Sequence, residues 1–218
     1  MSATTDGDRR ARRRNMSVDE RRREIVLTAA KLFDQYGYAA VSVDHIAEVV
    51  GVAKPTLYYY FTSKNDILEA IHVQVSEFLS SRFDDRDGTD ISTPEQLFEV
   101  IADILEMYVA LPGHQRVYVE HQRELSDAAR AGVVERREIY RGRVSGLLLR
   151  GIQEGVWVIP DPRITMHQIL GMCSYSYQWY SDSTFPPPRD VAVVFWRNMM
   201  GGIASDSYRA SNPTFEIR

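Results

Sequence analysis

The chain has 218 residues, enough for one large domain or for a small domain joined to a larger one, and its 44% hydrophobic and 26% charged residues exclude a disordered chain. No run of about 18 apolar residues occurs, and no apolar stretch follows the arginine-rich N-terminus, so neither a transmembrane helix nor a secretory signal is expected. Cys173 is the only cysteine, which excludes an intrachain disulfide and indicates a cytoplasmic protein.

Charge is distributed unevenly along the chain. Residues 1–65 carry 11 Lys and Arg against 8 Asp and Glu, giving +3, and the remainder carries 15 against 22, giving −7, which together make the net charge of −4. This asymmetry favours a nucleic-acid-facing N-terminal segment. The alternative is that the arginine run is only a solvated tail.

The N-terminal segment shows four helical patterns after a basic arm. Residues 1–16 lack an apolar pattern and are predicted to be disordered. Ser17 and Glu20 match a capping box, which predicts a helix over about 18–36. Short helices are then predicted at 43–50, capped by Ser42, and at 54–61, followed by a long helix that starts at Ser63-Lys64 and runs to about 81.

The rest of the chain is also helical in pattern. After a polar loop at 83–93, helices are predicted at 94–111, about 114–124 and about 128–154. Two final helices, at 163–182 and 189–205, flank the segment FPPP. No convincing strand pattern appears, so the predicted fold class is all-α.

Two short helices joined by a tight turn at Gly51 are typical of a helix-turn-helix unit, whose second helix enters the DNA major groove. On a helical wheel, Leu57 and Phe61 face inward and Tyr59 faces outward, so the tyrosine hydroxyls can meet phosphates and Lys54 and Thr56 can meet bases. The alternative is an aromatic cluster packed under the next helix. The predicted DNA-binding residues are Arg12, Arg13, Ser42, Val43, Ala53, Lys54, Pro55, Thr56, Tyr58, Tyr59, Tyr60 and Lys64.

The run TAAKLFDQYGYAAVSVDHIAEVVGVAKPTLYYYFTSKNDIL resembles the DNA-binding domain of TetR-family transcriptional regulators across about residues 21–70. The resemblance implies an all-helical homodimer whose fourth helix shifts when a ligand binds to a variable C-terminal domain, releasing DNA. It divides the chain into the arm, a DNA-binding domain at 17–65 and a ligand-binding and dimerisation domain at 66–218. Ala53 departs from the family pattern, which often has a capping Ser there.

The last two predicted helices carry apolar residues on more than one face, among them Val194 and Met200. A surface helix needs only one apolar stripe, so the extra face predicts a homodimer built from these two helices of each subunit. The alternative is one large core within a monomer.

Polar and aromatic residues set among apolar ones are candidates for contact with a mainly hydrophobic effector, although ordinary core packing is the alternative for each of them. The predicted ligand-binding residues are Tyr108, Tyr118, His121, Gln122, Tyr140, Met172, Tyr175 and Trp179. Arg137, Arg141 and Arg143 offer a partner for an anionic group or else form a solvated face. The segment GIQEGVWVIPDPRI is similar to a turn in many TetR-family regulators, including those of lipid and steroid catabolism, and favours a fatty-acyl or steroid-derived ligand.

A metal site is also conceivable, because His121 and Glu124 share a helix face. No HExxH motif or Cys/His cluster accompanies them, so neither a metal nor a cofactor is expected, and no spacing indicates catalysis. The sequence thus favours a repressor that binds a palindromic operator as a homodimer and is released by an effector. The alternatives are a helical enzyme or a protein-interaction module without specific DNA binding.

Overall fold

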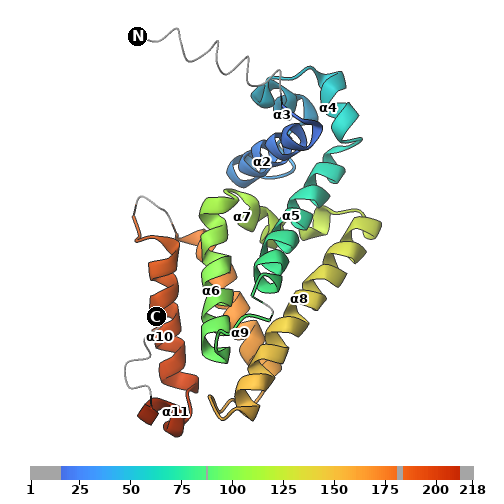
Figure 1. Ribbon diagram of the computed structural model, residues 1–218. Helices are drawn as coiled ribbons and strands as arrows, with labels where there is room; N and C mark the ends of the chain where they lie inside the picture. Colours follow the sequence, from blue (N-terminus) through green and yellow to red (C-terminus); the bar gives the residue numbers. More distant parts are fainter. Residues whose placement is uncertain (1–15, 87, 181–183, 212–218) are drawn as a thin grey trace.

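The computed structural model describes residues 16–86, 88–180 and 184–211, which form two stacked helical units (Figure 1). Within these ranges β pairing is confined to an isolated bridge between Trp157 and Ala204, so the predicted all-α class is confirmed. The predicted arm lies outside the described residues except for Met16.

The N-terminal unit is made of α2 (Val18–Tyr36), α3 (Val43–Val50) and α4 (Lys54–Tyr60). Its helix ends follow from local chemistry. Ser17 and Glu20 form the predicted capping box, each accepting a hydrogen bond from the other's backbone N–H. Gly51 ends α3 in the left-handed conformation, at φ 76° and ψ 38°, which a residue with a side chain rarely adopts.

The longer helices form the rest of the molecule. They are α5 (Lys64–Asp84), α6 (Thr93–Ala110), α7 (His114–Glu120), α8 (Asp127–Gln153), α9 (Pro162–Ser174), α10 (Pro188–Ile203) and α11 (Asp206–Ser211), with 3₁₀ turns at Gln122–Glu124 and Tyr175–Gln178. The predicted helix at 163–182 was too long, because α9 ends at Ser174. The hydroxyl of Tyr108 donates to the carbonyls of Cys173 and Ser174, which satisfies acceptors that a longer helix would have used. The short helix α11 was not predicted.

Two hydrophobic cores are joined through α5. Ile67, Leu68 and Ile71 belong to the core of the N-terminal unit. About one and two turns after Ile71, Val75 and Leu79 belong to the core of the C-terminal unit, which α6, α8, α9 and α10 complete. In Figure 1, α5 descends from the N-terminal unit and lies between α6 and α8. A displacement of α5 therefore reaches both units.

A second joint between the units is made by α7, which packs on both α2 and α5. Gly113, at φ 85°, begins it where a Cβ atom would lie 2.8 Å from the carbonyl oxygen of Ala30 in α2. Only glycine fits both this conformation and this approach. Arg116 adds an ion pair from α7 to Asp34 of α2, with Nε 2.7 Å from Oδ1.

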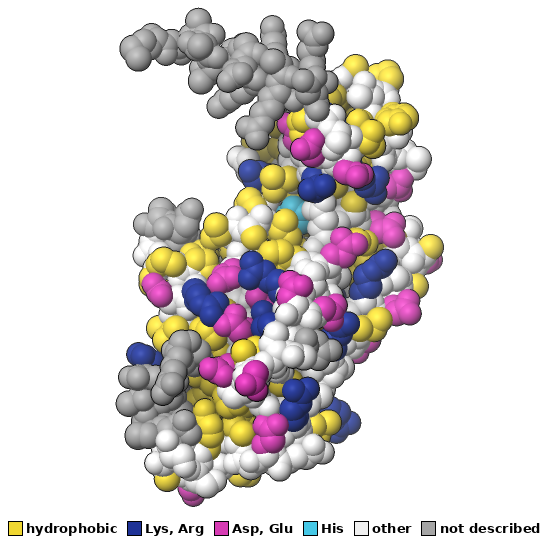
Figure 2. All heavy atoms as spheres, viewed as in Figure 1, with side chains coloured by type: hydrophobic (Ala, Val, Ile, Leu, Met, Phe, Trp, Pro, Cys, Tyr) yellow, Lys and Arg dark blue, Asp and Glu magenta, His cyan; other side chains and the backbone are white. Residues whose placement is uncertain are grey.

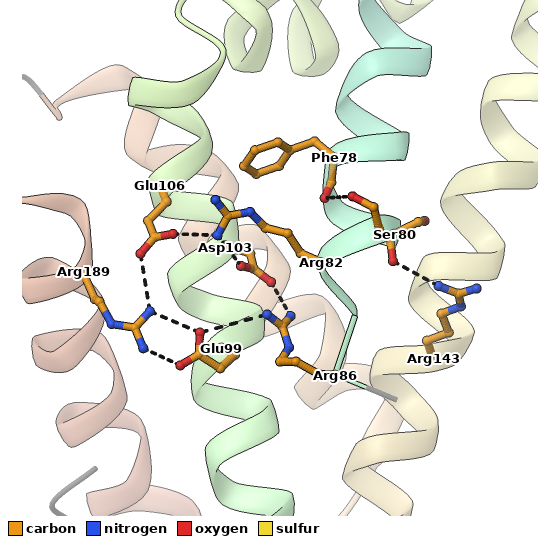
Figure 3. A network of polar contacts seen from close by, with 10 residues as sticks. Phe78, Ser80, Arg82, Arg86, Glu99, Asp103, Glu106, Arg143 and Arg189 are labelled. Carbon is orange, nitrogen blue, oxygen red and sulfur yellow. Dashed lines mark hydrogen bonds and ion pairs between the residues drawn. The ribbon is translucent and has the colours of Figure 1, made fainter. Parts of the chain in front are cut away.

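An ion-pair network joins the end of α5, the middle of α6 and the first turn of α10 (Figure 3). Asp103 of α6 is completely buried and accepts hydrogen bonds from Arg82, at 3.1 Å, and from Arg86. Burial raises the pKa of Asp103, and the two guanidinium groups oppose that rise. Arg189 of α10 joins from the other side by pairing with Glu99 and Glu106. The network thereby links α5, α6 and α10.

Replacing Asp103 with alanine is expected to lower the free energy of unfolding by about 3 kcal/mol, because two guanidinium groups lose a fully buried partner. Urea denaturation at pH 7 measures the change. As a control, Glu138→Ala removes an exposed partner of Arg141 and should cost less than about 1 kcal/mol. Equal losses in the free energy of unfolding for the two substitutions would show that the buried network stabilises the protein no more than an exposed ion pair does.

Candidate functional site

The helix-turn-helix geometry fixes which side of α4 faces outward. Leu57 and Phe61 are buried in the N-terminal core, as predicted from the helical wheel. Tyr59 is 75% exposed and Tyr58 is 42% exposed, and Tyr60 lies half-buried with its ring 5.1 Å from that of Tyr59. Figure 2 shows hydrophobic side chains, a class that includes tyrosine, gathered at the α4 end of the molecule. The segment is therefore an exposed surface, and not an aromatic cluster under the next helix.

The remaining predicted DNA-binding residues of this unit lie along the same turn and helix. Ala53, Lys54, Pro55 and Thr56 are exposed. Ser42 caps α3 by accepting from the N–H of His45, and Val43 follows it. Ala53 makes no side-chain cap for α4, as its departure from the family pattern implied. Arg12 and Arg13 lie outside the described residues. The DNA contacts of all these residues remain predictions.

Lys54 has an intramolecular partner that the sequence analysis missed. Its ammonium lies 2.8 Å from Oδ1 and 2.9 Å from Oδ2 of Asp44 on α3. The hydrogen bond to Asp44 raises the pKa of Lys54. The two residues are ten positions apart, so the pair connects the two helices of the motif across the turn, and no helical spacing signals it. Asp44 therefore occupies the ammonium group that is predicted to contact DNA.

Lys64 points toward the protein. Its ammonium donates to the carbonyl oxygens of Tyr38 and Val41, at 2.8 and 2.9 Å, and lies 4.1 Å from the centre of the Tyr38 ring. Partial burial lowers its pKa. These two hydrogen bonds anchor the start of α5 to the loop before α3. Since an ammonium group has three N–H donors, one donor remains for the predicted contact with a phosphate.

A cavity of about 240 Å³ lies between α5, α6, α7, α8 and α9. Leu79, Ile104 and Leu170 supply apolar walls, and Tyr118 and Tyr140 are the predicted ligand residues that line it. Arg137 borders it from α8, donating to the Tyr118 hydroxyl at 3.1 Å and to Gln122 Oε1 at 2.7 Å. A mainly apolar cavity with a few placed polar groups is typical of a small-molecule site.

A larger groove, of about 1050 Å³, runs between α2 and α5. Its walls include charged side chains such as Arg23, Glu69 and Glu77, and it is a wide surface groove. The smaller cavity is the better effector candidate because its walls belong to the C-terminal core and to both joints with the N-terminal unit.

Other predicted ligand residues lie elsewhere. Tyr108 ties α6 to the end of α9, His121 lies 3.2 Å from Glu124, and Met172 packs on the C-terminal core. Tyr175 is exposed at the end of α9, and Trp179 belongs to an aromatic cluster with Phe185 and Phe195. Sequence reasoning did not select Gln115 and His167, which do line the cavity, because single polar residues in helical segments carry no distinguishing pattern.

The surface of α10 is apolar in part. Val194 is 54% exposed, and Val193, Phe195 and Met199 are half-buried. Met200, predicted to share the partner-facing surface, is instead completely buried in the C-terminal core. The cluster around Trp179 extends this surface toward the end of α9. It is a candidate interface for a second copy of the chain.

In the described ranges no group of three or more His, Cys, Asp or Glu side chains is placed to hold a metal ion. None of the helices there has the length and apolar character needed to cross a membrane.

Comparisons with known proteins agree with this geometry. Residues 25–71 match the family model of bacterial regulatory proteins, tetR family, and residues 90–203 match that of the Tetracyclin repressor-like C-terminal domain. The sequence is 25% identical over 195 residues to the transcriptional repressor KstR2 of Mycobacterium tuberculosis, covering 87% of this chain and 96% of KstR2. It is 26% identical over 174 residues to the nucleoid occlusion factor SlmA of Haemophilus influenzae, covering 78% and 79%.

Solved structures show the same fold. The structure of KstR2 superposes with a TM-score of 0.80 at 22% identity, covering 87% of this chain and 98% of that one. The structure of AibR in complex with isovaleryl coenzyme A and operator DNA gives a TM-score of 0.71 at 23% identity, covering 81% and 96%.

An exposed helix-turn-helix on a helical C-terminal unit defines a DNA-binding regulator of transcription. The chain belongs to the TetR family of transcriptional regulators, as the resemblance in the sequence predicted.

Replacing Asp44 with asparagine is expected to release Lys54 and to steepen the salt dependence of binding to random-sequence DNA, with the slope of log K against log salt increasing by about 0.9. Fluorescence anisotropy from low to moderate salt measures this slope. Adding Lys54→Ala to Asp44→Asn should return the slope to its original value or below. An unchanged slope in the Asp44→Asn protein would mean that Asp44 does not restrain Lys54.

His72 of α5 packs behind the cavity with its ring centre 5.2 Å from that of Tyr118, and burial together with the charge of Arg137 lowers its pKa to about 3. The unfolded chain binds a proton near pH 6.5, so stability is full above that pH and falls as the pH drops toward 3. At pH 5 the loss from His72 is about 2 kcal/mol. His72→Leu should therefore lose about 2 kcal/mol less than the unmodified protein between pH 7 and pH 5 in urea denaturation. Identical losses would contradict a neutral buried imidazole.

Proposed function

We propose that this TetR-family regulator is an effector-responsive repressor that binds a palindromic operator as a homodimer and leaves it when a mainly hydrophobic molecule occupies the cavity. One observation carries the proposal: the helices that line the cavity are also those that hold the N-terminal unit. Leu79 of α5 lines the cavity, and Ile67 and Ile71 of the same helix lie in the N-terminal core.

The second wall of the cavity has the same double role. Gln115, Tyr118 and Val119 of α7 line it, while Val117 of the same helix is buried in the N-terminal core. The contact at Gly113 and the ion pair of Arg116 attach α7 to α2. An effector that displaces α5 or α7 therefore reorients α4 relative to its partner in the dimer. A hundredfold release of DNA requires the effector to prefer the released conformation by about 2.7 kcal/mol.

The names of two relatives support the repressor role and the binding of an effector. KstR2 is named a transcriptional repressor, and AibR was crystallised with both isovaleryl coenzyme A and operator DNA. We propose a division of labour in this chain, with residues 17–65 binding DNA and residues 66–218 binding the effector and the second subunit. A fatty-acyl or steroid-derived effector fits the resemblance noted in the sequence.

The dimer is proposed to form through the apolar surface of α10 and the neighbouring aromatic cluster. Such an isologous contact places two recognition helices in successive major grooves, about 34–36 Å apart or somewhat more. That spacing requires an operator that is an imperfect palindrome.

Val194→Asp tests the assembly and the DNA binding together. The exposed carboxylate should block the apolar contact, giving monomers in sedimentation velocity at micromolar concentration and at least tenfold weaker anisotropy binding to DNA from beside the protein's own gene. Val158→Asp, at a still more exposed position in the turn before α9, is the control and should remain dimeric. A monomeric unmodified protein, or a monomer that binds its operator at full strength, would contradict the proposal.

A further inference from the structure

Two buried polar atoms belong to residues that line the cavity and have no hydrogen-bond partner within the described part of the chain. They are the hydroxyl of Tyr140 and Oε1 of Gln115. Tyr140 is 7% exposed and Gln115 is 3% exposed, so solvent does not replace the missing partners. The amide nitrogen of Gln115 is engaged, donating to the carbonyl of Ser174 at 3.4 Å. Buried polar groups are nearly always paired, so these two exceptions require an explanation.

A cation lies beside them in the same wall. Arg137 is half-buried and uses its guanidinium on the hydroxyl and carbonyl of Tyr118 and on the amide oxygen of Gln122, all of which are neutral groups. Across the described ranges, no carboxylate comes within ion-pair distance of it. Arg141, one turn further along α8, also borders the cavity and is paired with Glu138. A partly buried cation without an anion favours a ligand that brings one.

The size of the cavity limits the ligand. Its volume of about 240 Å³ lies below the roughly 300–1,000 Å³ of typical small-molecule pockets, which favours a small ligand. The apolar walls made by Leu79, Ile104 and Leu170 suit an aliphatic chain of that size. The four fused rings of a steroid are larger and more rigid than such a chain and match this cavity less well.

We propose that the cavity recognises a short aliphatic acyl compound with a negatively charged end, with Tyr140 and Gln115 binding the polar part of the acyl group and Arg137 attracting the charge. The Tyr140 hydroxyl donates to the acyl oxygen. Gln115 Oε1 accepts an N–H or O–H from the ligand. A free 3-hydroxy acid supplies a hydroxyl for Gln115 and a carboxylate for Arg137. A coenzyme A thioester supplies an amide N–H near its acyl group, and its phosphates, at the far end of the pantetheine arm, would lie outside the cavity. This assignment rests on the proposed function for its regulatory meaning, and it chooses the acyl class over the steroid class.

Isothermal titration calorimetry of the DNA-free protein tests the ligand class with defined probes. Hexanoyl coenzyme A and 3-hydroxyhexanoate are the two acyl probes. Coenzyme A lacks the acyl chain and hexanol lacks the negative charge, so these two serve as half-probes. A steroid acid represents the steroid class of ligand. At least one of the first two should bind ten times more tightly than either half-probe and than the steroid acid. Tighter binding of hexanol or of the steroid acid, or no binding by either acyl probe, would overturn the proposal.

Tyr140→Phe is the sharpest variant because it removes only the unpaired hydroxyl. It should weaken the bound acyl probe about tenfold while leaving the melting temperature unchanged or higher, since no protein partner is lost. Arg137→Gln should reduce the preference for the charged probe over hexanol about tenfold. Arg136→Gln, on the exposed neighbouring position, is the matched control and should bind like the unmodified protein. Unchanged probe binding by Tyr140→Phe would overturn the assignment.

The regulatory role is measured separately, by adding the same probe to a preformed protein–DNA complex and following anisotropy. A probe that binds as expected but leaves DNA bound contradicts the proposed function and leaves the ligand assignment standing. Release of DNA by a steroid acid, with no binding of the acyl probes, would support the proposed function and contradict the ligand assignment.

Discussion

The continuous apolar face of α5 is the constraint on which the rest of the molecule depends. Its first turns complete the core under the helix-turn-helix, and its later turns complete the core around the cavity. A helix is stiff along its axis because each turn is hydrogen-bonded to the next. The two units therefore share one rigid element, so a small change of packing at Leu79 is not absorbed by a flexible linker.

The polar network at the far end of α5 complements this arrangement. Arg82 and Arg86 extend from its last turns to Asp103, and Arg189 extends the network to α10, which carries the candidate dimer surface. Ion pairs that are buried cost desolvation, and in some proteins they specify one arrangement among several. One element thus connects the helix-turn-helix, the cavity and, through this network, the candidate dimer surface.

Local signals made the helices predictable, whereas long-range contacts did not. The capping box at Ser17 and the left-handed Gly51 depend on neighbours within a few positions, so the sequence placed α2, α3 and α4 to within a residue. The end of α9 depends on a hydroxyl from Tyr108, 65 positions away, and the inward turn of Lys64 depends on carbonyls more than 20 positions away. The cavity draws its walls from five helices, so pattern alone could select Tyr118 and Tyr140 but not Gln115. Burial of Met200 on the inner side of α10 was also missed, because it depends on packing against helices that are distant in the sequence.

The contact of Gly113 with Ala30 is made between backbones, with no side chain between the two residues. Side chains change rotamer within a packed interface and so absorb part of any movement, but backbone atoms in van der Waals contact cannot. A tilt of α7 is consequently passed to α2 with little loss of amplitude. Because position 113 carries no side chain, the two backbones touch and have little freedom to shift against each other. This single contact therefore helps to fix the orientation of the DNA-binding unit on the C-terminal unit.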